Sequence, residues 1–130
     1  MSIDTIITNV RVVTSDNVNP IDADIAITNG VIVEVGPGLD KDKAKEVVDG
    51  KGRIAFPGVV DAHEHWGIYN PLNEDARSES MACAQGGVTS AITYIRTGQY
   101  YLNKGGRYED FFPDVLAACK DNAYVDYAFH

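Results

Sequence analysis

The first half of the chain alternates β-branched and other hydrophobic residues with polar ones, a pattern typical of β-strands. The strands that this pattern predicts cover residues 3–14, 25–28, 31–35 and 53–56. Asn29-Gly30 lies between two of them and suits a tight hairpin turn of type I′, because both residues tolerate a positive φ. The charged run 40–45 is expected to be a solvated loop. We therefore expect residues 1–56 to form a small antiparallel sheet domain.

After Pro57 the pattern changes to strands that alternate with helices. Strands are expected over 59–63, 88–95 and 124–130. Asn73 is a candidate N-cap of the first helix, and Gly86-Gly87 is its expected end. Strand, helix, strand, helix and strand in succession imply parallel strands joined by crossover helices. The second half is therefore expected to be α/β.

The second helix is expected to begin after Asp110, with Pro113 in its first turn, where a missing N–H costs no intrahelical bond. Its predicted apolar stripe consists of Phe112, Val115, Leu116 and Cys119. Cys83 and Cys119 both fall within helices and have no short metal-type spacing, so we interpret them as reduced packing residues.

The composition argues against several classes of partner. The chain has 130 residues, a formal net charge of −8 and 45% hydrophobic residues. Such an acidic chain lacks the basic face that nucleic acids and anionic membranes require. No apolar run approaches the roughly 20 residues needed to span a bilayer, and residues 1–13 lack the features of a signal peptide. We expect a cytoplasmic protein without a nucleic-acid or membrane partner.

The stretch PGVVDAHEHWG, residues 57–67, carries the clearest chemical pattern. Side chains alternate along a strand, so Asp61, His63 and His65 share one face if the strand extends that far, with the two histidines about 6.6 Å apart at the backbone. Imidazoles at that spacing can converge on one ion, with Zn–N bonds of about 2.0–2.1 Å. Glu64 points to the other face and is a poor candidate for a shared ligand.

A His-x-His pair alone is also explained by two solvated or hydrogen-bonded histidines. Three ionisable groups on one face of an apolar strand are costly to bury unless they are paired or ligated. They also lie at the carboxyl end of a predicted parallel strand, where α/β enzymes place their sites. This context favours a metal site.

Several segments resemble the metal-dependent amidohydrolase superfamily, and within it the cyclic amidohydrolases: dihydropyrimidinase, hydantoinase and allantoinase. PGVVDAHEH resembles the superfamily's metal-binding motif, and the similar segments around it are DIAITNGVIVEVGP, VVDGKGRIAFPG, EDARSESMACAQGGVTSAI and VDYAFH. The resemblance implies an α/β fold: residues 1–56 belong to a β-sandwich domain, and 57–130 to the first part of a (β/α)₈ TIM-like barrel that this chain leaves incomplete.

The resemblance also implies a chemistry. His63 and His65 bind a divalent metal, Asp61 supports them from the same strand, and an intact site holds two zinc ions. A metal-bound hydroxide attacks the ring amide carbonyl of a dihydropyrimidine, a hydantoin or an allantoin. The bridging carboxylated lysine, two further histidines and the catalytic aspartate are expected beyond residue 130.

Aromatic residues near the motif are candidates for a substrate pocket. Trp66 and Tyr69 are placed to stack on a planar ring, or else to pack against neighbours. His130 shares a strand face that leads to the barrel mouth, where it lines the pocket or packs in the core. Three further residues follow the second strand and either reach the pocket or lie in a solvated loop: Tyr94, Arg96 and Tyr100.

The number of ligands limits what this chain can do alone. A catalytic zinc site needs three protein ligands, and a TIM barrel takes about 250 residues. We therefore expect the chain to work with the C-terminal part of the same enzyme or with a companion chain, and the resemblance implies a homo-oligomer. Two alternatives remain open: a non-catalytic scaffold of the same fold, and a stand-alone binding domain.

Overall fold

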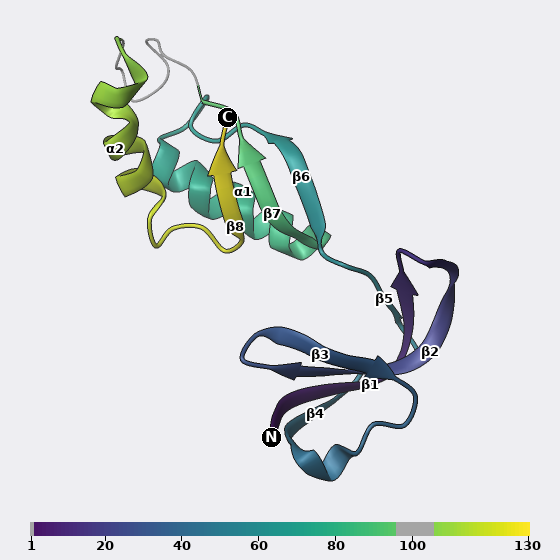
Figure 1. The fold of residues 1–130 in the computed structure, drawn as a ribbon. Coiled ribbons are helices and arrows are strands. Elements are labelled where there is room, and N and C mark those ends of the chain that lie inside the picture. Colours follow the sequence, from purple (N-terminus) through teal and green to yellow (C-terminus); the bar gives the residue numbers. More distant parts are fainter. Residues whose placement is uncertain (1, 96–105) are drawn as a thin grey trace. The chain divides into compact units, whose positions relative to one another are not determined.

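The computed structural model describes residues 2–95 and 106–130, so the candidate pocket residues Arg96 and Tyr100 lie outside the described part. The chain divides into two compact units, Met1–Pro57 and Gly58–His130, and each is described by itself (Figure 1). Within the described part, no helix has the length and apolar character needed to cross a membrane.

The first unit is a five-stranded sheet. Its strands are β1 (Ile3–Thr14), β2 (Asn17–Thr28), β3 (Val31–Gly36), β4 (Ala44–Asp49) and β5 (Ile54–Ala55). The order is β3-β2-β1-β4, and β5 also pairs with β1. The pairs β1–β2 and β2–β3 are antiparallel, whereas β4 and β5 run parallel to β1. The sheet is therefore mixed, where the sequence alone predicted only antiparallel pairing.

The local sequence explains both the predicted hairpin and the difference in topology. Asn29 and Gly30 have φ values of 51° and 74°, as the predicted hairpin turn requires. After β3 the chain passes through a short 3₁₀ helix, η1 (Lys41–Lys43), and returns along the other side of β1. Ala44 and Lys45 were assigned to a loop from their charged surroundings, but they begin β4. These residues form a strand because their backbone pairs with β1, which their local sequence does not indicate.

The second unit is a three-stranded parallel sheet with two helices. Its elements are β6 (Val59–Glu64), α1 (Leu72–Gly86), β7 (Val88–Thr93), α2 (Tyr108–Cys119) and β8 (Asp126–Phe129). The strand order is β6-β7-β8 and both pairings are parallel. The predicted succession of parallel strands and crossover helices is confirmed (Figure 1).

The helix boundaries follow capping chemistry only in part. Gly87 is left-handed, with φ 86°, and its N–H bonds the carbonyl oxygens near the end of α1, so the predicted end is confirmed. The N-cap of α1 is Pro71 rather than Asn73: the Pro71 carbonyl accepts from two backbone N–H groups of the first turn. The N-cap of α2 is Arg107 rather than Asp110, so Pro113 lies inside the helix and not in its first turn.

The core of the second unit lies between the sheet and the helices. On α2 the buried side chains are Phe111, Val115 and Cys119, one on every fourth residue, whereas Leu116 is 44% exposed. The predicted stripe thus missed Phe111 and wrongly included Leu116, because two adjacent phenylalanines leave the helix phase ambiguous. The remaining buried members of this core are Trp66, Leu72, Ala76, Ala91 and Ile95.

We predict that Gly50→Ala destabilises the first unit. A Cβ at Gly50 would lie 2.1 Å from Val10 Cγ1 and 2.9 Å from the Thr8 carbonyl oxygen, which accepts the Gly50 N–H. Such an overlap costs about 1–3 kcal/mol of unfolding free energy, measurable by urea denaturation. Gly36→Ala is the matched control, because its Cβ would meet nothing within 4 Å. Equal denaturation midpoints for the two variants would contradict the packing described here.

Candidate metal centre

His63 and His65 meet at the carboxyl end of β6. Their Nε2 atoms are 3.0 Å apart, and the two rings lie edge to face with centroids 4.8 Å apart. His63 belongs to β6 and His65 is the first residue beyond it, so the strand ends one residue earlier than the alternation argument required. The two imidazoles nevertheless share one side, and both are exposed.

The donor set of this pair fits a divalent metal ion. Two Zn–N bonds of about 2.0–2.1 Å at a tetrahedral angle place the nitrogens about 3.3 Å apart. The observed 3.0 Å between the Nε2 atoms needs only a small adjustment. In residues 2–95 and 106–130, no group of three or more His, Cys, Asp or Glu side chains gathers in a way that could hold an ion. The described part therefore brings two candidate ligands together.

The acidic neighbours of the histidines have different roles. Asp61 Oδ1 accepts the backbone N–H of His63 at 3.0 Å, so it holds the backbone of the first histidine. Glu64 projects away from the pair toward α1, where its Oε1 accepts from the Cys83 thiol at 3.2 Å. This is the opposite-face orientation that the strand pattern predicted.

The ends of the three strands bring four rings together. Tyr94, just after β7, has its ring centroid 5.6 Å from His65 and 6.3 Å from His63. His130, just after β8, lies 5.7 Å from His63 and 5.6 Å from Tyr94. The structure thus places both Tyr94 and His130 beside the metal-ligand candidates. His130 also lines an apolar cavity of about 510 Å³, together with Ile95, Tyr108, Phe112 and Phe129.

Trp66 and Tyr69, the two aromatic candidates for a substrate pocket, have different surroundings. Trp66 is fully buried in the core, with its ring 5.7 Å from that of Tyr127. Its indole faces protein on every side, so of the two roles left open for Trp66 the structure supports packing and not stacking on a substrate ring. Tyr69 is 93% exposed in the loop that follows.

Two residues that organise this region were missed by the sequence reasoning. Thr93, at the end of β7, is fully buried, and its Oγ1 accepts the backbone N–H of Trp66 at 3.0 Å. Asp75, in the first turn of α1, accepts from the Gly67 N–H at 2.8 Å and from Asn70 Nδ2 at 2.9 Å. The sequence offers little signal for Thr93, because threonine is an ordinary member of a β-branched strand. Asp75 is a common type of residue for the first turn of a helix, so its sequence gives no sign of the contacts with Gly67 and Asn70.

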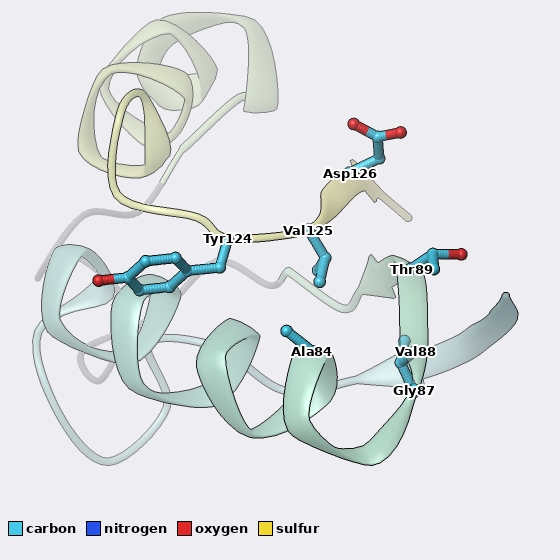
Figure 2. A pocket seen from close by; sticks show the side chains of 7 residues that line it. All are labelled: Ala84, Gly87, Val88, Thr89, Tyr124, Val125 and Asp126. Carbon is cyan, nitrogen blue, oxygen red and sulfur yellow. The ribbon is translucent and has the colours of Figure 1, made fainter. Parts of the chain in front are cut away.

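A second hollow lies at the opposite end of the strands. This cavity has a volume of about 350 Å³. Figure 2 shows the residues that line it: Ala84, Gly87, Val88, Thr89, Tyr124, Val125 and Asp126. It adjoins the amino ends of β7 and β8, whereas the histidines lie at the carboxyl ends. Barrel enzymes place their chemistry at the carboxyl ends, so the candidate centre is the histidine pair.

Comparisons with known proteins point to one superfamily. No protein-family model matches the chain. The chain is 34% identical over 107 residues to an allantoinase of Rubrobacter xylanophilus, covering 82% of this chain and 22% of that protein. It is 31% identical over 128 residues to a D-hydantoinase of Geobacillus stearothermophilus, covering 96% of this chain and 26% of that protein. A D-hydantoinase crystal structure superimposes with a TM-score of 0.79 at 29% identity, covering 97% of this chain and 26% of that one.

The fold, the histidine pair and these similarities agree: the chain belongs to the metal-dependent amidohydrolases. Within that superfamily it falls in the cyclic amidohydrolase branch, and it spans about a quarter of the length of the relatives it matches.

We predict that Cys83 is unreactive toward iodoacetamide at pH 8. Burial, and next the hydrogen bond to Glu64, raise the pKa of the Cys83 thiol to about 11, and the thiolate is the nucleophile. The alkylation of Cys83, measured by mass spectrometry, should therefore be about a hundredfold slower than that of free cysteine, whose pKa is about 8.5. Glu64→Gln should lower the pKa of Cys83 and speed its alkylation. Cys119 is the internal control, because burial alone raises the pKa of its thiol to about 11 and Glu64→Gln should leave its alkylation rate unchanged. Alkylation of Cys83 in the folded chain at the rate of free cysteine would contradict this.

Proposed function

We propose that this chain supplies the first two metal ligands, His63 and His65, of a hydrolase that opens a cyclic amide. The observation that carries the proposal is the 3.0 Å approach of the two Nε2 atoms at the carboxyl end of β6. The similarity to proteins described as allantoinase, D-hydantoinase and dihydroorotase supports the substrate class. The scissile bond is then a ring C–N amide bond.

The chain's own residues bind and orient in this proposal. A divalent ion held by the pair supplies Lewis acidity, which lowers the pKa of water and polarises a carbonyl group. Asp61 holds the His63 backbone through its 3.0 Å hydrogen bond. Tyr94 and His130 form the adjoining wall, with ring centroids 5.6 Å apart. Tyr69 is too exposed to form part of this wall without further contacts.

We propose that the remaining ligands of the centre are supplied by further protein. A catalytic zinc site has three protein ligands and an open position, and the described residues bring two together. We propose zinc as the metal, two ions in the intact site, and a bridging carboxylated lysine supplied by further chain or by a companion chain. A homo-oligomeric assembly and a cytoplasmic location belong to the same proposal.

The alternative function is a non-catalytic scaffold of the same fold. A scaffold has no need of a convergent imidazole pair, and this chain has one with facing Nε2 atoms. We therefore favour the enzyme.

We predict that His63→Ala and His65→Ala each weaken zinc binding by the 130-residue chain about tenfold or more, because each removes one of two ligands. His130→Ala is the matched control: it removes a neighbouring imidazole 5.7 Å from His63 and should leave zinc affinity within about twofold. Isothermal titration calorimetry measures all three. Unchanged affinity in both ligand variants would refute the metal site.

We also predict that the 130-residue chain alone hydrolyses none of dihydrouracil, hydantoin and allantoin. Two exposed imidazoles leave an ion largely hydrated, and in residues 2–95 and 106–130 both rings are open to solvent, so a substrate ring would not be held in place for attack. A spectrophotometric or chromatographic assay at saturating zinc checks this. Turnover of any of the three rings with stoichiometric, tightly bound zinc would show that the centre is already complete.

A further inference from the structure

The backbone on both sides of His65 is tied to the end of β7. Before His65, the Glu64 carbonyl oxygen accepts the Tyr94 N–H at 2.7 Å and lies 3.4 Å from Thr93 Oγ1. After His65, the Trp66 N–H donates to the same Thr93 Oγ1 at 3.0 Å. The two peptide groups that flank the histidine are therefore both fixed by residues 93 and 94.

The Thr93 hydroxyl has the capacity for both contacts. A threonine hydroxyl has one donor hydrogen and two acceptor lone pairs. It can accept from Trp66 and donate to Glu64 at the same time, which the two distances allow. Thr93 is fully buried, so no solvent competes for these bonds, and removal of the hydroxyl leaves the Trp66 N–H without this partner.

This bridge matters because His65 lies outside regular structure. β6 ends at Glu64, so no sheet pairing of its own fixes the φ and ψ angles of His65. Those two angles set the direction of the Cα–Cβ bond, and this direction determines where the imidazole ring can lie. With both flanking peptide groups anchored, the direction is fixed, and the Tyr94 ring at 5.6 Å limits the ring's rotation.

We infer that Thr93 is the positioning residue that holds His65 in its metal-ligating orientation. The inference rests on the proposed function, since it presumes that His65 is a ligand. Thr93 is not one of the ligands in this inference: it acts through the backbone on either side of His65. Partners of this kind beyond the ligands typically contribute a factor of 10–100 in metal affinity.

The test compares Thr93→Val with Thr93→Ser in the 130-residue chain. Valine keeps the β-branched shape and removes the hydroxyl, whereas serine keeps the hydroxyl and removes the methyl group. Zinc affinity is measured by calorimetry, and Co²⁺ provides a visible absorption spectrum that reports ligand geometry. We expect T93V to weaken zinc binding about tenfold and to alter the Co²⁺ spectrum, and T93S to stay within about threefold of the parent chain.

Ser80→Ala is the matched control for a general loss of stability. Ser80 is also fully buried, and its hydroxyl also bridges two backbone groups, donating to the Ala76 carbonyl and accepting the Tyr124 N–H at 3.0 Å. It contacts neither histidine, so S80A should keep zinc affinity within about threefold of the parent chain. Circular dichroism establishes that each variant is folded, and Thr93→Ala replaces T93V if the valine variant is not.

The outcomes separate this inference from the proposed function. Parent-like zinc binding by T93V, or equal weakening by T93S or S80A, overturns the role of Thr93 while leaving the histidine site intact. Parent-like binding by His65→Ala instead overturns the metal site itself. Weak binding by T93V and His65→Ala, with T93S and S80A near the parent chain, is the result that the inference predicts.

Discussion

The pairing of three parallel strands at their carboxyl ends is the constraint on which the candidate centre depends. The Tyr94 N–H bonds the Glu64 carbonyl at 2.7 Å, and the His130 N–H bonds the Thr93 carbonyl at 3.1 Å. Because parallel strands end at the same edge of a sheet, residues more than 60 positions apart in the chain arrive side by side. The rings of His63, His65, Tyr94 and His130 are neighbours for this reason.

Strand β6 separates the exposed side that carries the histidine pair from the side that packs against α1. At β6, His63 lies exposed while Glu64 turns toward α1 and accepts from Cys83. Behind them, Trp66 is fully buried and anchors the loop that follows the histidines into the core. Asp75 closes that loop from the first turn of α1 through the Gly67 N–H. The exposed imidazoles thus lie next to a buried, hydrogen-bonded base, which is the kind of support that holds metal ligands in place.

Much of this architecture could be predicted from local patterns. The alternation in PGVVDAHEH predicted a strand with two histidines on one side, and Gly86-Gly87 predicted a helix end that the left-handed Gly87 confirms. The succession of strand and helix patterns predicted parallel pairing. These features depend on residues that are close in sequence, where strand and helix periods act directly.

The features that the sequence could not reveal depend on distant contacts. β4 is parallel to β1 because the chain crosses the sheet after β3, and no local pattern encodes that crossing. Trp66 follows the histidine motif and resembles a pocket residue in sequence, but packing with Tyr127 and the helices buries it. Thr93 reads as an ordinary strand residue, and only its contacts across to Glu64 and Trp66 give it a specific role.

The central claim is that His63 and His65, and not the neighbouring His130, bind a divalent ion together. The most direct measurement is a zinc titration of ¹⁵N-labelled chain, followed by NMR spectra that correlate the imidazole nitrogens with the ring protons. The account predicts that Nε2 of both His63 and His65 shifts to values typical of metal-bound nitrogen at the same zinc concentration, while the His130 nitrogens keep their shifts. Zinc-dependent shifts at only one of the pair, or at His130 in place of either, would contradict it.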